Sequence, residues 1–272
     1  MTVCIAVLCQ WNYGTRDNPA PAPVAIVVSD RMITAGDVQY EPQQTKHANI
    51  TPKILLVIAG DSLHSQAIRK TAAHFKGSMT ATPEDVATFY GRTIQALKLR
   101  EAEDLYLAPL GLNSDSFLAQ QKDMAPHFIS LLTEQMQAYR GEEVDALVIG
   151  PREQDVVSIY GVDTKGMVTC HDDVGFAAIG NGAWHVKSRL MQFGYANSNV
   201  FSTALVISYA AKKVSELAPG VGTNTDIKIV FRDHVEEIRP DVGNKLHSLI
   251  LELERKPTNL ARSASTGCTN TW

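Results

Sequence analysis

Four residues in the first 60 positions carry the groups that nucleophilic chemistry uses: a hydroxyl, a carboxylate, an amine and a backbone N–H at the start of a helix. They are Thr2, Asp30, Lys46 and Gly60. A hydroxyl is a weak nucleophile at neutral pH and needs a neighbouring base or charge to activate it. These groups can therefore act together only if the elements that carry them bring them into contact.

A predicted hairpin would place the hydroxyl beside the carboxylate. Apolar, β-branched runs over residues 3–9 and 24–28 indicate strands covered on both faces, and the proline-rich segment 10–23 between them indicates a loop. If this loop closes near its two ends, antiparallel pairing sets residues whose numbers sum to about 32 opposite one another. Thr2 would then face Asp30.

A second, tighter hairpin would place the amine beside the glycine. Residues 48–50 and 54–59 are predicted strands, and residues 51–53 form the turn between them. Pairing of residues whose numbers sum to about 104 or 105 brings Lys46 beside Ala59 and Gly60. Whether the two hairpins meet is a question of tertiary structure that neither register answers.

The rest of the chain alternates between strands and amphipathic helices. Helices are expected over residues 63–75, 82–103, 117–139 with a kink or break at Pro126, 184–193, 200–217 and 246–253. Strands are expected over residues 145–150, 156–162, 167–170, 174–179, 227–231 and 235–238, whereas 33–44 should be mostly irregular. This order suits an α+β fold, a four-layer αββα sandwich of two antiparallel sheets flanked by helices. We expect one domain over residues 1–240, followed by a helix and a polar tail over 241–272.

Composition disfavours several classes of partner. The chain has 272 residues, 44% of them apolar and 20% charged, with a net charge of -4 and no basic cluster, so neither nucleic acid nor an anionic membrane is an expected partner. The apolar run over 54–60 is far shorter than the ~20 residues of a membrane span. Four cysteines without CxxC spacing, and no secretory signal, favour a cytoplasmic location.

The order and spacing of the residues resemble the proteasome β-type subunits, and the opening TVCIAV is especially similar to the bacterial ancestral β-subunits. The matching positions are Thr2, Asp30, Thr34, Gly36, Lys46 and the pair Ala59-Gly60, with spacings of 16 residues from Asp30 to Lys46 and 14 from Lys46 to Gly60. Farther along, DALVIG, SIYGVDTKG and FAAIGNG follow the order of the family's strands. The resemblance covers roughly residues 2–231, and its specific motifs lie in the first 60.

The resemblance implies an N-terminal-nucleophile hydrolase fold and a threonine-type peptidase or amidase. Thr2 would be the nucleophile once Met1 is removed, and the freed α-amine, with a pKa near ~8, would be its base. Lys46 would hold a positive charge beside the hydroxyl, and Asp30 would orient Lys46 through a charge-assisted hydrogen bond.

Other positions would bind the substrate. The N–H of Gly60 would stabilise the oxyanion, and Thr34 and Gly36 would line a groove that holds a peptide as an added strand. Asn181 stands where the family usually has a serine between two glycines, and it is a candidate for a site role or for a simple strand-to-helix turn.

A further Asp and Ser pair expected after the last long helix is not recognisable within residues 215–225, where Ser215, Glu216, Thr223 or Asn224 could substitute. The resemblance also implies peptide or protein substrates, a closed or open homo-oligomeric ring and a possible unfoldase partner, with no cofactor. No metal site is expected, because adjacent residues on an extended chain, as in Cys170–Asp173, rarely chelate one ion. Two alternatives stay open: a hydrolase of small amides and a catalytically silent assembly subunit.

Overall fold

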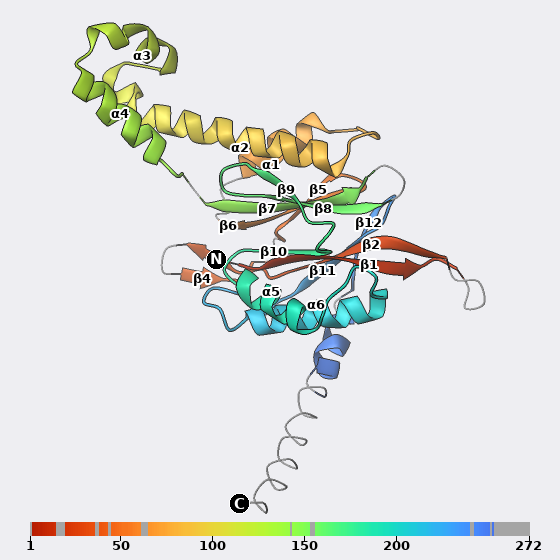
Figure 1. Cartoon of the computed structure of the whole chain (residues 1–272). Helices are drawn as coiled ribbons and strands as arrows, with labels where there is room; N and C mark the ends of the chain where they lie inside the picture. Colours follow the sequence, from red (N-terminus) through yellow and green to blue (C-terminus); the bar gives the residue numbers. More distant parts are fainter. Residues whose placement is uncertain are drawn as a thin grey trace, which may run out of the picture.

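The computed structural model describes residues 2–14, 20–35, 38–42, 45–60, 65–141, 143–152, 156–239, 242–250 and 252. Two five-stranded antiparallel sheets lie one on the other (Figure 1). In spatial order the first contains β10 (Phe176–Ile179), β1 (Cys4–Asn12), β2 (Pro21–Ser29), β11 (Asp226–Val230) and β12 (Val235–Glu237). The second contains β5 (His47–Thr51), β6 (Ile54–Gly60), β7 (Val144–Pro151), β8 (Val157–Val162) and β9 (Val168–Cys170). A separate two-stranded sheet pairs β3 (Ile33–Ala35) with β4 (Val38–Tyr40).

Helices cover the outer faces of both sheets. The second sheet is covered by α1 (Ser65–His74) and α2 (Pro83–Tyr106), and the first by α5 (Ala183–Gln192) and α6 (Phe201–Ser215) (Figure 1). The order of layers is therefore helix, sheet, sheet, helix, as predicted. Residues 242–250 form another helix, whose Leu246 and Ile250 pack into the core beneath the first sheet, so the polypeptide beyond residue 240 contributes to that core.

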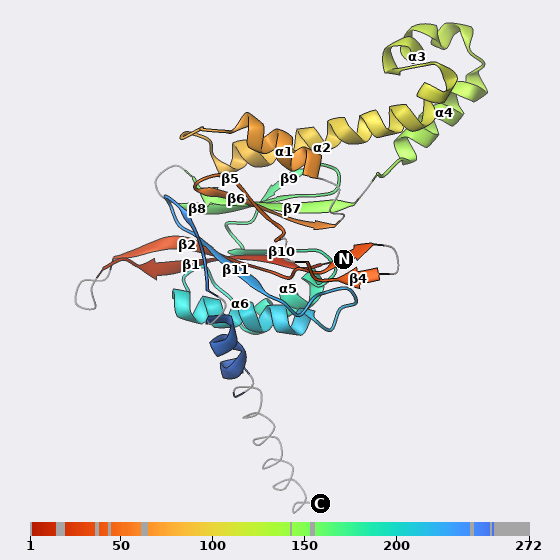
Figure 2. The same ribbon diagram turned by 180° about the vertical axis from the view of Figure 1, so that it is seen from behind.

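Strand residues alternate between two cores because successive side chains point to opposite faces of a sheet. In β1, Ile5 and Val7 pack with α5 and α6, whereas Cys4 and Ala6 face the second sheet. Both faces of the strand are buried, which explains why it has no polar side. The polar residues Gln10 and Asn12 lie near the far end of β1, and the N-terminus lies at the other end, beside β4 in both views (Figures 1 and 2).

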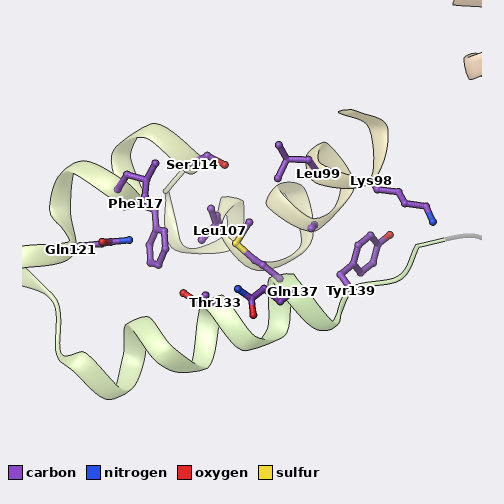
Figure 3. A pocket seen from close by; sticks show the side chains of 12 residues that line it. Lys98, Leu99, Leu107, Ser114, Phe117, Gln121, Thr133, Gln137 and Tyr139 are labelled. Atoms are coloured by element: carbon purple, nitrogen blue, oxygen red, sulfur yellow. The ribbon is translucent and has the colours of Figure 1, made fainter. Parts of the chain in front are cut away.

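A helical extension projects beyond the end of the sheets at which the N-terminus lies (Figure 2). It comprises η2 (Ala108–Leu110), α3 (Ser114–Gln120), η3 (Gln121–Asp123) and α4 (Pro126–Ala138), all following α2. Together with the end of α2 it surrounds a cavity of about 430 Å³ that Leu107, Phe117 and Met136 help to line (Figure 3). Among the described residues, no helix is long and apolar enough to cross a membrane.

Most local expectations are confirmed. The helix expected to begin at residue 82 starts at Pro83, and Thr82 caps it in a capping box with Asp85. The break expected at Pro126 lies just before α4, of which Pro126 is the first residue. The β5–β6 register falls in the predicted range, with His47 opposite Val57, and Ile58 N donates to Lys46 O at 3.3 Å.

Three expectations need correction. The first hairpin is one residue out of register, because Cys4 faces Ser29, and its strands extend to Asn12 and from Pro21, which shortens the predicted loop. Lys46 lies opposite Ile58, not Ala59. Residues 33–44 contain the β3–β4 pair, whose three-residue strands are too short to show a hydrophobic period.

Candidate active site

Thr2, Asp30 and Lys46 meet at the end of the stacked sheets. Lys46 Nζ donates hydrogen bonds to Thr2 Oγ1 and, at 2.8 Å, to Asp30 Oδ1, and Thr2 Oγ1 donates to the same carboxylate oxygen. Thr2 is 1% exposed, Asp30 is fully buried and the Lys46 side chain is 12% exposed. Thr2 and Asp30 from the first hairpin and Lys46 from the second therefore form one set of three side chains joined by hydrogen bonds.

The stacking of the sheets explains why they meet. Thr2 lies just before β1, Asp30 follows the last residue of β2, and Lys46 precedes the first residue of β5. The first two belong to one sheet and the third to the other, so Lys46 reaches its partners across the interface between the sheets. An antiparallel register within either hairpin could not reveal this contact.

The Asp30 carboxylate is held by the backbone as well as by side chains. Its Oδ1 accepts from Val3 N at 3.1 Å, and its Oδ2 accepts from Gly222 N at 2.7 Å and from Met32 N at 3.3 Å. These three N–H groups come from different parts of the backbone, and Lys46 adds a charge-assisted hydrogen bond. The orientation of the Asp30 side chain is consequently fixed.

The turn at Gly180 packs directly on the backbone of Thr2. Gly180 has φ +85°, and a Cβ atom placed there would lie 2.3 Å from Thr2 O and 3.1 Å from Ala59 Cβ. Gly182 N donates to Thr2 O at 3.3 Å, while Asn181 between the two glycines is exposed. Only glycine fits position 180, and the Gly-Asn-Gly turn is part of the site's wall.

A cavity of about 210 Å³ adjoins this cluster. It is lined by Met32, Ile33, Thr45, Lys46, His47, Ala48, Ile58, Gly60, Ile68 and Arg69. Gly60 ends β6 with φ +133°, and a Cβ atom there would lie 2.3 Å from Glu143 O, so this position also requires glycine. The 430 Å³ cavity of the helical extension contains none of the residues in the cluster, so we assign the chemistry to the smaller cavity. Thr34 belongs to β3, but its side chain and all of Gly36 lie outside the described residues.

The sequence did not identify the groups that hold the segment between α6 and β11. Lys212 Nζ donates to Gly222 O at 2.8 Å and Thr223 O at 3.1 Å, and the Glu41 carboxylate accepts from Asn224 N at 3.1 Å. Arg31 pairs with Asp226 at the start of β11.

The four residues considered for a second polar pair have other roles. Ser215 Oγ donates to Lys212 O at 2.6 Å, Glu216 binds Lys212 and Lys213, and the Thr223 carbonyl accepts from Lys212. The Asn224 amide donates to Glu41. No Asp and Ser pair forms within this described segment; the Gly-Val-Gly at 220–222, between a helix and a strand, was the available signal.

Searches of protein-family models and of curated proteins found no match for this chain. The function must therefore be argued from the geometry of these residues. Over the described ranges, no group of three or more His, Cys, Asp or Glu side chains could hold a metal ion. Asp172, in the segment considered above for metal binding, accepts a hydrogen bond from Ile159 N at 2.9 Å.

His47, next to Lys46, is kept uncharged by its surroundings. Its Nε2 lies 2.9 Å from Ser29 Oγ, and its buried Nδ1 has no hydrogen-bond partner among the described residues. The pKa of His47 is lowered to about 4, mainly by burial; the charges of Lys228, Arg31 and Lys46 also lower it, and that of Asp226 opposes them. A neutral imidazole thus lies beside the lysine ammonium.

Replacing Asp30 by alanine should destabilise the fold strongly. The change leaves the Lys46 ammonium and the N–H groups of Val3 and Gly222 without their acceptor, and breaking a buried ion pair costs about 3–5 kcal/mol. Urea denaturation should show this loss in the free energy of unfolding. Asp233→Ala, which removes an exposed carboxylate, is the matched control and should change it by less than about 0.5 kcal/mol. Equal effects of the two variants would contradict the central place of Asp30.

Acid should destabilise the wild-type protein partly through His47. Its pKa is depressed in the folded state, so the unfolded chain binds the additional proton, and stability falls as the pH drops from about 6.5 towards about 4. We expect His47→Gln to reduce the loss of unfolding free energy between pH 7 and pH 4 by on the order of 2 kcal/mol. His234→Gln, at an exposed position, should leave the loss unchanged. Identical acid sensitivity in His47→Gln and the wild type would refute this role.

Proposed function

We propose that this chain is an N-terminal-nucleophile hydrolase of the proteasome β type, a threonine peptidase or amidase whose nucleophile is Thr2 after removal of Met1. The observation that carries the proposal is the direct contact of Thr2 Oγ1 with both Lys46 Nζ and Asp30 Oδ1. A lone threonine near a chain end has no such partners. The sequence resemblance also assigns roles to these three positions: Thr2 is the nucleophile, Lys46 is the cation beside it, and Asp30 is the acid that orients Lys46.

The reaction follows from the residue types. The freed α-amine of Thr2 takes the hydroxyl proton as the oxygen attacks the scissile carbonyl, and the Lys46 ammonium stabilises the developing negative charge on that oxygen. Asp30 holds Lys46 in place. The N–H of Gly60 stabilises the carbonyl oxyanion, the amine product leaves with a proton, and water then hydrolyses the Thr2 ester.

The cavity beside Lys46 and Gly60 limits what can bind. Its volume of about 210 Å³ is below the ~300–1,000 Å³ of pockets that enclose a whole ligand, so it fits a single side chain or a small acyl group. β3 pairs only with β4 among the described strands, which leaves an edge where an extended peptide could add as a strand. We favour a peptide substrate, and the small cavity makes a small amide the second candidate.

Mechanism-based labelling tests this proposal. A β-lactone or epoxyketone probe should add one equivalent to protein whose intact mass lacks Met1, and peptide mapping should place the label on Thr2. Thr2→Ala should take up none, whereas Thr93→Ala, at a part-buried helical threonine, should label like the wild type. Labelling that persists in Thr2→Ala would refute the assignment. Absence of labelling in wild-type protein that begins at Thr2 would favour a silent assembly subunit. Comparison of fluorogenic peptides with small acyl-amides separates the two substrate classes.

Self-assembly is part of the proposal and has its own support. Trp184 and Met191 on α5 and Leu217 after α6 are 80%, 67% and 78% exposed, and large exposed apolar side chains are candidates for burial in an interface. We expect light scattering to give a mass several times that of the 29.7 kDa chain. Trp184→Glu should lower this mass, and Leu99→Glu, at an exposed leucine on the distant α2, should not. A monomeric wild type would exclude a ring.

A further inference from the structure

The segment that follows α6 contributes a backbone donor to the Thr2 cluster. We call residues 220–225 the Gly222 loop. Its Gly222 N–H lies 2.7 Å from Asp30 Oδ2, the carboxylate oxygen opposite the one that Thr2 and Lys46 contact. The position of this loop therefore affects the orientation of the acid.

Lys212 holds the loop from the opposite side. Its ammonium has three N–H donors, and three oxygen acceptors surround it. They are the carbonyls of Gly222 at 2.8 Å and Thr223 at 3.1 Å, and the carboxylate of Glu216 one helical turn along α6. The side chain is fully buried. Gly222 is thus bound through its carbonyl by Lys212 and through its N–H by Asp30.

Transferring the Lys212 ammonium from water to the protein interior costs free energy. Desolvation lowers the pKa of Lys212, and the Glu216 carboxylate and the charge of Asp30 oppose this effect, while the two carbonyls replace part of the lost hydration. Replacing a buried ion pair by apolar side chains of similar size is often neutral or stabilising, so such a pair is weak evidence for stability. Three satisfied hydrogen bonds do, however, fix a position closely.

We propose that Lys212 is a positioning residue for the Thr2 site: by holding the carbonyls of Gly222 and Thr223, it keeps the Gly222 N–H on Asp30 and so fixes the carboxylate that orients Lys46 and Thr2. This inference rests on the proposed function for its kinetic consequence. The geometry from Lys212 to Asp30 does not depend on that function.

Lys212→Met and Lys213→Met form a matched pair of variants. Both variants remove one ammonium from the same turn of α6 and one partner of Glu216, which Lys213 binds at 2.9 Å. The two lysines differ in burial, because the Lys213 side chain is 19% exposed and the Lys212 side chain is fully buried. Each variant would be examined for thermal unfolding, for amide hydrogen exchange over residues 218–226, and for the rate constant and half-saturation of labelling by the β-lactone probe.

In Lys212→Met we expect faster exchange at the Gly222 loop and a labelling rate constant reduced about tenfold to a hundredfold, the range for loss of a hydrogen bond to a charged group. The probe concentration that gives half-saturation of labelling should change less than about twofold, because the cavity beside Lys46 is not altered. Lys213→Met should match the wild type in both measurements. A purely structural role for Lys212 would lower the unfolding temperature without this separation of rate constant from half-saturation.

Several results would overturn the inference. These are an unchanged labelling rate constant in folded Lys212→Met, a reduced rate constant with unchanged loop exchange, or the same reduction in Lys213→Met. If Lys212→Met does not fold, Glu216→Gln, which removes the ammonium's counter-charge, should show the same two changes to a smaller degree, and wild-type behaviour in that variant would refute the proposal. If the wild type takes no label, the proposed function fails, but the exchange comparison still decides whether Lys212 holds the loop.

Discussion

The structure depends on supplying hydrogen-bond donors to one buried side chain, the carboxylate of Asp30. A buried carboxylate is tolerated only when donors replace the water it has lost. Here the donors come from separate parts of the chain: the backbone before β1, the Gly222 loop before β11, and the lysine at the start of β5. The stacking of the two sheets and the position of that loop must both be correct for this carboxylate to be satisfied.

The burial of the apolar strands determines where the polar site can lie. Because both faces of β1 and β6 are buried, polar chemistry is confined to the ends of the strands, where the backbone is no longer paired on both sides. The Gly180 turn closes this end against Thr2, and the Gly222 loop closes it against Asp30. Glu41 binds the N–H of Asn224 and Lys212 binds the carbonyls of Gly222 and Thr223, so groups from the strand region and from α6 hold neighbouring residues of the same loop.

Much of the fold could be predicted from the sequence because the relevant interactions are local. Thr82 and Asp85 form their capping box within one helical turn, Pro126 is suited to the first turn of α4, and the turn at residues 51–53 sets the β5–β6 register. The first hairpin was predicted less accurately, because its loop is long and no turn residues mark where the pairing of the two strands begins.

The amino-acid sequence by itself determined which groups are available and their order: Thr2 ahead of a buried strand, Asp30 at the end of its partner, Lys46 and Gly60 on a second hairpin. Only the tertiary structure decided that Lys46 crosses from one sheet to touch Thr2, and that a buried lysine on α6 holds the loop whose N–H reaches Asp30. The physical reason is the separation along the chain between the residues that interact. Caps, turns and strand periods are set by neighbours along the chain, whereas contacts across stacked sheets arise from packing among residues far apart in sequence, which no local pattern encodes.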